Sequence, residues 1–382
     1  MTDRLNSALG NIRKSSIREF TRIAKQVEGC MFLTLGEPDF NTPDCVKEKA
    51  KEALDNNLTH YPENNGQLYL RQAIADFGRR KNGLDYTPDE VVVTIGATEA
   101  LFTALFGIID PGDEVIVPVP AYVLYEQVIN LCRGSFVPLE TGDTAFQITR
   151  ERLEAAITPK TKAIILTSPN NPTGCIYTKE TLDVIADVLR DKKIFVICDD
   201  VYSQLVYTDE YRSFSSYREF RDRLIVIQSF AKPYAMTGWR VGYLMTDLPV
   251  KQKLETIHQY MVVSAASFVQ PACVEALEYD PSPMIGIYRK RRDYVYDRVK
   301  AMGLPVNKPE GAFYIFPDIS EFGMDSVAFA TRLAYEGKLA VTPGAGFGAD
   351  NCVRISYSYS DQELKEGMDR LEGFVNALRA AK

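Results

Sequence analysis

Short runs of consecutive apolar residues alternate with amphipathic segments through the middle of the chain, from about residue 47 to residue 280. The runs are rich in Val and Ile, whereas the segments between them, such as 97–109 and 179–191, have apolar residues at helical spacing. Strands that are apolar along their whole length are buried on both faces, so the alternation predicts a mostly parallel sheet covered by helices. We expect strands at 90–96, 113–120, 161–169, 193–200 and 223–230.

The pattern changes after DPSPM (280–284), which interrupts the alternation. A charged helix, three apolar strands and a terminal amphipathic helix follow, and the first 45 residues also lie outside the alternating pattern. We therefore predict an α/β chain with a large domain at 46–281 and a smaller α+β domain formed by 1–45 plus 282–382. The later strands are expected at 312–319, 338–344 and 352–358, and the last helix at 361–381.

The composition is that of an ordinary globular protein and limits the classes of partner. The 382 residues are 46% hydrophobic and 25% charged, which suits a large core and two domains. A formal net charge of −7 argues against a general binder of nucleic acid or anionic membranes. The basic run YRKRRDY (288–294) is a local exception. We interpret its charges as the exposed face of a helix, because Tyr288, Val295, Val299 and Met302 have helical spacing.

Cysteine and histidine usage points away from disulfides and metal sites. The seven cysteines stand singly, without a CxxC pair, which is typical of core residues in a reducing compartment. The first residues lack the apolar segment of a signal peptide and no apolar run could span a bilayer, so we expect a cytoplasmic protein. His60 and His258 are the only histidines, which excludes His-rich metal sites and disfavours a Ser-His-Asp triad.

Chemically useful residues directly follow each of the five expected strands. Ligands of an open α/β sheet bind beyond the carboxyl ends of its strands. Each residue alone could be a cap, a turn or a core side chain, but together at one sheet edge they predict a binding site. They are Gly96, Ala97 and Thr98 after the first strand, Tyr122 after the second, Asn170 and Asn171 after the third, Asp199 and Tyr202 after the fourth, and Ser229 and Lys232 after the fifth.

These residue types define the groups that a ligand would carry. The turn at Gly96 opens a helix whose unpaired N–H groups favour a phosphate. Arg240 and Ser229 could add charge-assisted hydrogen bonds to the same anion. The ring of Tyr122 suits stacking on a flat heterocycle, and a buried Asp199 needs a cation beside it.

Lys232 completes the set with an amine. A lysine in an apolar loop has a lowered pKa and suits Schiff-base formation. Pro233 helps, because it biases Lys232 away from helical geometry. A phosphate, a planar ring, a ring cation and an aldehyde together describe pyridoxal 5′-phosphate.

Three motifs then give the chain a family resemblance. SFAKPYAMTGWRVGYL (229–244), NNPTG (170–174) and DDVY (199–202) resemble the cofactor-lysine segment, the asparagine loop and the Asp-x-x-Tyr pair of class I aminotransferases. These enzymes belong to fold type I of the pyridoxal-phosphate superfamily. The resemblance extends from Gly36 to Arg354 and so covers most of the chain. NPTG alone would be a weak signal, whereas all three motifs in order are specific.

The resemblance implies a role for each matching residue. Lys232 would form the internal aldimine and shuttle the proton, and Asp199 would keep the pyridine nitrogen protonated. Arg354 would bind the substrate α-carboxylate as a bidentate fork. Ala231 stands where many relatives have serine, which puts one phosphate or lysine contact in doubt. Tyr202 and Asn171 would hydrogen-bond the ring phenolate oxygen, Tyr122 would stack on the ring, Gly96, Ala97, Thr98, Ser229 and Arg240 would hold the phosphate, and Gly36 would lie beside the substrate carboxylate.

A homodimer with shared active sites is also implied. Tyr61, in the loop LTHYPENNG (58–66), matches the tyrosine that in this family reaches the partner subunit's cofactor phosphate. The simpler interpretation is a tyrosine on a surface loop.

Other functions stay open or are disfavoured. PGAGFGAD (343–350) contains the pattern G-x-G-x-x-A, but a strand follows it and not the helix that a dinucleotide site requires. A β-lyase or decarboxylase could use the same cofactor site, although Arg354 and the NNPTG segment favour transamination. A non-enzymatic regulator on this fold would carry a DNA-binding domain ahead of FLTLGEP (32–38), where about 30 residues leave no room for one.

The substrate is predicted from further resemblances along the chain. An L-amino acid and a 2-oxo acid are expected to react by a ping-pong mechanism. The segments 17–20, 258–270 and 290–304 resemble aromatic or N-acetyl-diaminopimelate aminotransferases. Bacterial aspartate aminotransferases often have a lysine where Thr98 lies, which disfavours strict aspartate specificity without excluding acidic donors.

Overall fold

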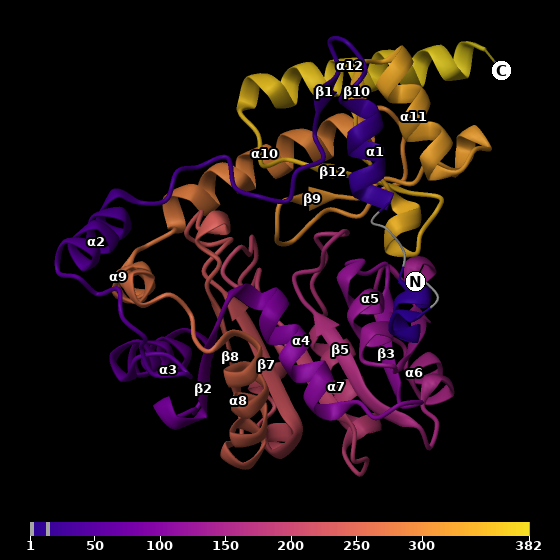
Figure 1. Cartoon of the computed structure of the whole chain (residues 1–382). Coiled ribbons are helices and arrows are strands. Elements are labelled where there is room, and N and C mark those ends of the chain that lie inside the picture. The colour runs from indigo at the N-terminus through magenta and orange to yellow at the C-terminus, as the bar shows by residue number, and fades with distance from the viewer. Residues whose placement is uncertain (1–3, 13–15, 382) are drawn as a thin grey trace.

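A seven-stranded sheet forms the centre of the computed structural model, which describes residues 4–12 and 16–381 (Figure 1). Its strands are β2 (Val91–Thr94), β3 (Glu114–Val119), β4 (Ser135–Glu140), β5 (Thr161–Thr167), β6 (Phe195–Asp199), β7 (Leu224–Ser229) and β8 (Gly242–Thr246). The order is β2-β8-β7-β6-β5-β3-β4, and only β8 is antiparallel to its neighbours. The expected mostly parallel sheet is therefore confirmed.

All five strands expected from the alternation are present. Two strands of the sheet, β4 and β8, were not among those expected, although β8 is buried along its whole length. The strand β4 lies at the sheet edge, where most of its residues are exposed or half-buried. An edge strand needs no continuous apolar run, so the pattern that identifies central strands does not mark it.

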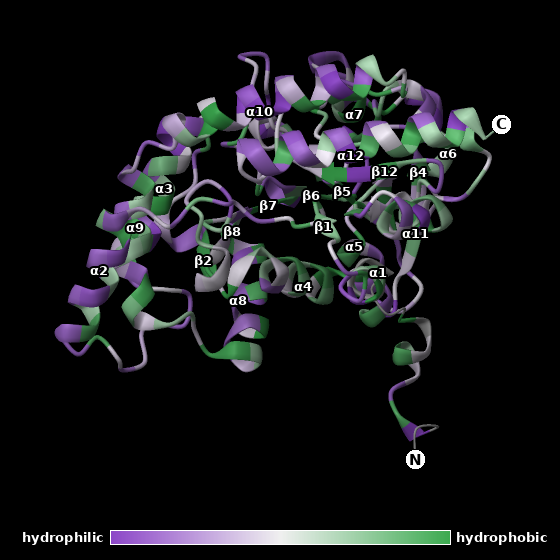
Figure 2. Ribbon diagram, turned by 90° about the horizontal axis from the view of Figure 1, so that it is seen from above, coloured by the Kyte–Doolittle hydropathy of each residue, from purple (hydrophilic) through white to green (hydrophobic). Residues whose placement is uncertain are grey.

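Helices cover both faces of the sheet, and successive strand residues point into different cores. Val92 packs in the core under α4, α5 and α8, whereas Val91 and Val93 pack on the opposite face. Figure 2 shows the apolar strands between these helices. The first set is α4 (Gly96–Ile108), α5 (Leu124–Leu131) and α8 (Leu248–Val262), and the other face carries α2 (Asp44–Asp55), α3 (Leu68–Asn82), α6 (Arg150–Ala156), α7 (Lys179–Leu189) and α9 (Gln270–Glu278).

A separate core joins the beginning and the end of the chain. Strand β1 (Met31–Phe32) pairs with β10 (Leu339–Ala340), while β11 (Thr342–Pro343) and β9 (Tyr314–Ile315) flank β12 (Val353–Ser356). The expected strand 338–344 is divided at Val341, because its two halves pair with different partners. The helices are α1 (Ser16–Ala24), α10 (Ser282–Ala301), α11 (Ser326–Glu336) and α12 (Asp361–Ala380).

This second core also takes in residues of the sheet region. Tyr202, Leu205 and Tyr207, which follow β6, are buried in it. The boundaries of the large domain at 46–281 thus stay a prediction. The separate core supports them, but the segment after β6 lies within 46–281 and packs in the second core. Within the described part of the chain, no helix combines the length and apolarity that a membrane span requires.

The basic run on α10 was only partly interpreted correctly. Tyr288 and Val295 are buried, as their spacing predicts, but Arg291 and Arg292 are buried too. Arg291 forms ion pairs with Asp39 and Asp361, with N–O distances of 2.8 and 2.9 Å. These charges are therefore not a wholly exposed face. Arg291 ties α10 to the segment after β1 and to the start of α12.

Candidate active site

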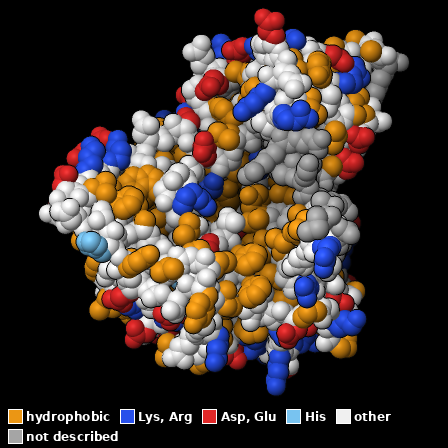
Figure 3. Space-filling view, viewed as in Figure 1, with side chains coloured by type: hydrophobic (Ala, Val, Ile, Leu, Met, Phe, Trp, Pro, Cys, Tyr) orange, Lys and Arg blue, Asp and Glu red, His pale blue; other side chains and the backbone are white. Residues whose placement is uncertain are grey.

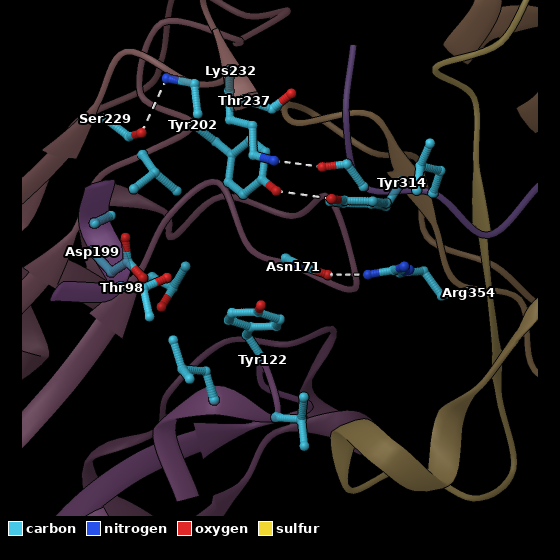
Figure 4. Close-up of a pocket in the computed structure, with 18 of the residues that line it drawn as sticks. Thr98, Tyr122, Asn171, Asp199, Tyr202, Ser229, Lys232, Thr237, Tyr314 and Arg354 are labelled. Atoms are coloured by element: carbon cyan, nitrogen blue, oxygen red, sulfur yellow. Dashed lines mark hydrogen bonds between the residues drawn. The ribbon is translucent and has the colours of Figure 1, made fainter. Parts of the chain in front are cut away.

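A cavity of about 770 Å³ lies where the carboxyl ends of the sheet strands meet the second core. Basic and apolar side chains gather in this hollow (Figure 3). Figure 4 shows Asp199 and Thr98 on one side and Arg354 on the other, with the ring of Tyr122 between them. The expected residues that line it are Gly36, Ala97, Thr98, Tyr122, Asn171, Asp199, Tyr202, Ser229, Lys232, Arg240 and Arg354.

Three expected residues do not line the cavity. Asn170 accepts hydrogen bonds from Thr173 N and Oγ1 instead, at 3.1 and 2.9 Å. Gly96 lies directly behind the cavity, since a Cβ at this position would come within 2.6 Å of Arg240 Nη2. The close approach and a φ of +77° both require glycine there. Tyr61 is 89% exposed and is not among the described residues that line this cavity.

The start of α4 presents free backbone donors to the cavity. The helix begins at Gly96, and Ile95 before it provides no capping side chain. Ala97 and Thr98 in its first turn line the cavity, and Arg240 lies beside this turn and donates to Thr237 O at 3.0 Å. Uncapped N–H groups with a guanidinium beside them make an anion site.

Asp199 is buried with one oxygen left unsatisfied. Its Oδ2 accepts a hydrogen bond from the Tyr125 hydroxyl at 2.6 Å, whereas its Oδ1 has no partner. Burial raises the pKa of the carboxyl. A buried carboxylate oxygen without a donor is costly, so the geometry fits a cationic N–H group at Oδ1. The protonated ring nitrogen of pyridoxal phosphate is such a group.

Tyr125 was not identified from the sequence. Its hydroxyl is also 2.7 Å from Thr167 Oγ1, so it links the carboxyl ends of β5 and β6. The residue lies in the first turn of α5, three positions after Tyr122, where a tyrosine is easily taken for a core residue. Only the Tyr-x-x-Tyr spacing could have pointed to it.

The neighbouring carboxylate, Asp200, has a different environment. It accepts hydrogen bonds from the hydroxyls of Ser213 and Ser215, at 2.6 and 3.2 Å, and does not line the cavity. Burial raises the pKa of Asp200 to about 7. Asp199 is therefore the carboxylate that a ligand in the cavity can reach.

Lys232 lies in the cavity with its Nζ donating to the carbonyl oxygen of Gly36. Burial lowers its pKa to about 8, against a smaller opposing effect of Glu37. The rings of Tyr202 and Phe313 lie 5.9 and 5.8 Å from Nζ. The amine thus has a substantial neutral fraction near neutral pH, which a nucleophile requires.

Tyr314 is a second residue that the sequence did not identify. Its hydroxyl is 2.8 Å from that of Tyr202, and both line the cavity. The Tyr314 hydroxyl would also come within 2.6 Å of a Cβ on Gly36, so a side chain at 36 would displace it. The expected strand at 312–319 contains Tyr314, but alternation does not say which of its residues faces a ligand.

Arg354 is buried and already partly coordinated. Its Nη1 donates to Asn171 Oδ1 at 2.9 Å and its Nη2 donates to Thr34 O at 2.8 Å, while Nε has no partner. The guanidinium lies over the rings of Tyr314 and Phe347, at 4.5 and 5.0 Å. Packing thus holds the fork in one orientation, which suits bidentate recognition of a carboxylate. Because Asn171 accepts from Arg354, its amide group is left to donate.

The glycine-rich run at 343–350 is not a dinucleotide-binding turn. A 3-10 helix at Gly344–Phe347 is followed by strand β12 and not by a helix. Phe347 instead packs beneath the guanidinium of Arg354. The expectation that a strand follows this run is confirmed.

The mouth of the cavity comes from α1, which the sequence did not connect to the site. Phe20 and Ala24 pack in the second core, whereas Thr21 and Arg22 of α1, with Lys25 in the turn directly after it, line the cavity. Helical spacing alone separates the packed face of α1 from its polar face. Nothing in the local sequence says which surface the polar face approaches.

Comparisons with known proteins agree with this geometry. The family model for aminotransferase class I and II matches residues 28–371. A probable N-acetyl-LL-diaminopimelate aminotransferase of Bacillus subtilis is 42% identical, covering 99% of this chain and 97% of the relative. Aromatic-amino-acid aminotransferase 2 of Thermococcus litoralis is 38% identical over 96% of this chain and 97% of its own. The crystal structure of an aspartate aminotransferase from Thermotoga maritima has a TM-score of 0.94 and 38% identity, covering 97% of this chain and 100% of that one.

Proposed function

The chain belongs to the class I and II aminotransferase family, and from this premise we propose how its residues act. The protein is a pyridoxal-phosphate-dependent enzyme of class EC 2.6.1 that moves an amino group between an amino acid and a 2-oxo acid. The observation that carries the residue assignment is the unsatisfied Oδ1 of Asp199, in the same cavity as the Lys232 amine. When bound, the cofactor supplies an electron sink for the substrate Cα.

Lys232 and Asp199 have complementary tasks. The Lys232 amine would hold the cofactor through its aldehyde group and, once displaced by the substrate amine, would take the proton from the substrate Cα and deliver it to the former aldehyde carbon. Its pKa of about 8 suits both tasks near neutral pH. Asp199, held by Tyr125, keeps the proton on the ring nitrogen through Oδ1.

The other residues that line the cavity hold the cofactor and orient the substrate. The N–H groups of Ala97 and Thr98, with Ser229 and Arg240, bind the phosphate, and Gly96 leaves room for Arg240. Tyr122 stacks on the ring, while Tyr202 and the amide of Asn171 donate to the ring oxygen. Arg354 binds the substrate α-carboxylate next to Gly36.

The charge of the cavity supports a substrate that carries a second carboxylate. Among the described residues that line it, Asp199 is the only acid, against five cations. Lys232, Arg240 and Arg354 have tasks in the scheme above, which leaves Arg22 of α1 and Lys25 directly after it at the mouth. These two favour an acidic donor or an N-acyl-diaminopimelate over an aromatic one.

A donor panel tests both the reaction and this substrate class. Single-turnover reaction of the cofactor-loaded enzyme with each donor avoids 2-oxoglutarate, itself a dicarboxylate. We expect 2-aminoadipate and an N-acyl-diaminopimelate to react faster than norleucine and phenylalanine. In Arg22→Gln/Lys25→Gln, only the donors with a second carboxylate should slow, while Lys365→Gln, an exposed change on α12, should alter none. Equal rates for all donors in the wild type would contradict the substrate class, and no reaction with any donor would contradict the residue assignment.

We also propose a homodimer in which Tyr61 reaches the partner's cofactor phosphate. Its 89% exposure in a single chain supports a role outside its own site. Lys232→Ala and Tyr61→Ala homodimers should each be impaired. A mixed dimer regains one complete site if Tyr61 acts across the interface, so co-refolded variants should exceed the average activity of the separate samples. No gain in confirmed heterodimers would contradict the proposal.

A further inference from the structure

His258 connects two functional segments without touching the cavity. It lies on α8 and is completely buried. Its Nδ1 is 3.0 Å from Glu99 Oε1 in the first turn of α4, and its Nε2 is 2.7 Å from the carbonyl oxygen of Asn64. Asn64 belongs to the loop that carries Tyr61. One ring therefore bridges the start of the proposed phosphate helix and the proposed partner-facing loop.

The hydrogen-bond partners determine the protonation state of this ring. The carbonyl of Asn64 can only accept, so Nε2 must carry a proton. Glu99 already accepts from Ile95 N at 2.9 Å and from Thr103 Oγ1 at 2.8 Å, as an ionised carboxylate does. Against an ionised Glu99, which can only accept, Nδ1 would have to donate as well. Both ring nitrogens are donors only in the imidazolium form.

Glu99 needs this cation because of its position. Its Oε2 holds the backbone N–H of Ile95, immediately before the Gly96 turn. A lone carboxylate there would repel an anion that approaches the N–H groups of Ala97 and Thr98. Glu99 therefore supports the shape of the turn, but at the price of a negative charge beside the phosphate site.

We propose that His258 is a positioning residue for the cofactor phosphate, acting as a buried imidazolium that neutralises Glu99 while Glu99 holds the Ile95–Gly96 turn. This role rests on the proposed phosphate site at α4. The same ring anchors the Tyr61 loop through Asn64, so it also couples the two chains' contributions to one phosphate. His258 acts through Glu99 and touches neither cofactor nor substrate.

The protonation state can be measured in the unaltered protein. The chain has two histidines, so a ¹⁵N-histidine-labelled sample gives two imidazole spin systems, and His60→Gln assigns them. At pH 7.5 the His258 ring should show two protonated nitrogens with and without bound cofactor. A neutral ring with one protonated nitrogen would overturn the proposal. This result does not depend on whether the enzyme transaminates.

The effect on the phosphate is tested by binding to apoenzyme. His258→Gln should weaken the binding of pyridoxal 5′-phosphate about tenfold, the upper range for one charge at a helix end. It should leave the binding of pyridoxal, which lacks the phosphate, unchanged. Adding Glu99→Gln to His258→Gln should restore the affinity for the phosphate ester, because the pair is neutral again.

A purely structural role predicts a different outcome. If His258→Gln and the double variant were equally weak, or if pyridoxal and its phosphate lost affinity alike, the charge role would be overturned. Lys251→Gln is the matched control, since it removes a buried cation that pairs with Glu255 on the same helix, at 2.6 Å. It should leave the dissociation constant unchanged. Failure of the wild type to bind the phosphate ester at all would instead refute the proposed function.

Discussion

The two walls of the cavity are built in different ways. The cofactor wall comes from the strand ends of the sheet, where Asp199 ends β6 and Ser229 ends β7. The substrate wall comes from α1, the segment after β1, and Tyr314 of β9. On the first wall the sheet brings together the residues that follow its strands, although the strand order β2-β8-β7-β6-β5-β3-β4 differs from the order along the chain. On the second, residues nearly 300 positions apart meet only through packing of the second core.

This difference explains which part of the function the sequence reveals. Carboxyl ends of parallel strands converge on one edge, so polar residues after strands are brought together by the sheet itself. No comparable rule brings together the residues that face the substrate. The reaction type is therefore readable from order and spacing, whereas substrate choice needs the folded chain.

The largest contrast should appear within the cofactor wall, between Asp199 and Asp200. Asp199→Asn removes the anion at the unsatisfied Oδ1 position, and a lost charge-assisted hydrogen bond in a dry site should lower kcat about 100-fold or more. Asp200→Asn should change kcat less than about threefold, because Asp200, with a pKa of about 7, is bonded by two serine hydroxyls away from the cavity. Steady-state kinetics of both variants with one donor measures the two losses in kcat. Equal losses would mean that the wrong carboxylate was assigned.

A change on the substrate wall should affect every donor. Arg354→Lys keeps the charge but loses the fork held by Asn171 and Thr34, so kcat/KM should fall about 30-fold. The loss should be the same for acidic and aromatic donors, since all share the α-carboxylate. If only one class of donor is affected, Arg354 binds the donor's side chain and not its α-carboxylate.

Tyr125 should give a smaller loss than Asp199. Tyr125→Phe removes the donor to Asp199 Oδ2 and the link to Thr167, while the ring keeps its packing. We expect kcat to fall about tenfold, the value of one such hydrogen bond. A variant that loses only thermal stability would show that Tyr125 is structural.

The smallest expected effect is the pH dependence of cofactor attachment. The neutral amine attacks the aldehyde, and burial lowers the pKa of Lys232 to about 8. The rate of reconstitution should therefore rise about fivefold from pH 7 to 8 and at most about twofold beyond, because half of the amine is already neutral at pH 8. An exposed lysine would give a rate that keeps rising towards pH 10. Stopped-flow absorbance of apoenzyme mixed with pyridoxal phosphate distinguishes the two.

The contrast between the two walls also separates the features that could be predicted from the sequence from those that could not. The strands β2, β3, β5, β6 and β7, the helices between them and cofactor residues such as Lys232 follow from apolar runs and the polar positions that end them. The buried strand β8 was not among the expected strands. The edge strand β4 was not either, because half-burial leaves no apolar run. Tyr125 and Tyr314 were missed because an aromatic residue in a helix or strand is equally consistent with packing.

The burial and the partners of charged residues were the hardest features to predict from the sequence. The spacing on α10 correctly marks Tyr288 as buried, but it cannot show that Arg291 is buried against two carboxylates contributed by distant segments. Likewise, His258 and Glu99 lie 159 positions apart and reveal their pairing only in the folded chain. Buried charges need partners, and the partners are set by tertiary structure.

The central claim is that Lys232 carries the cofactor, and borohydride reduction tests it most directly. The purified protein, loaded with pyridoxal phosphate, is reduced, digested and mapped by mass spectrometry. The account predicts a single phosphopyridoxyl label on Lys232, loss of the yellow colour, and no label in Lys232→Ala treated in the same way. A label on another lysine, or a protein that gains no absorbance band with added pyridoxal phosphate, would contradict it.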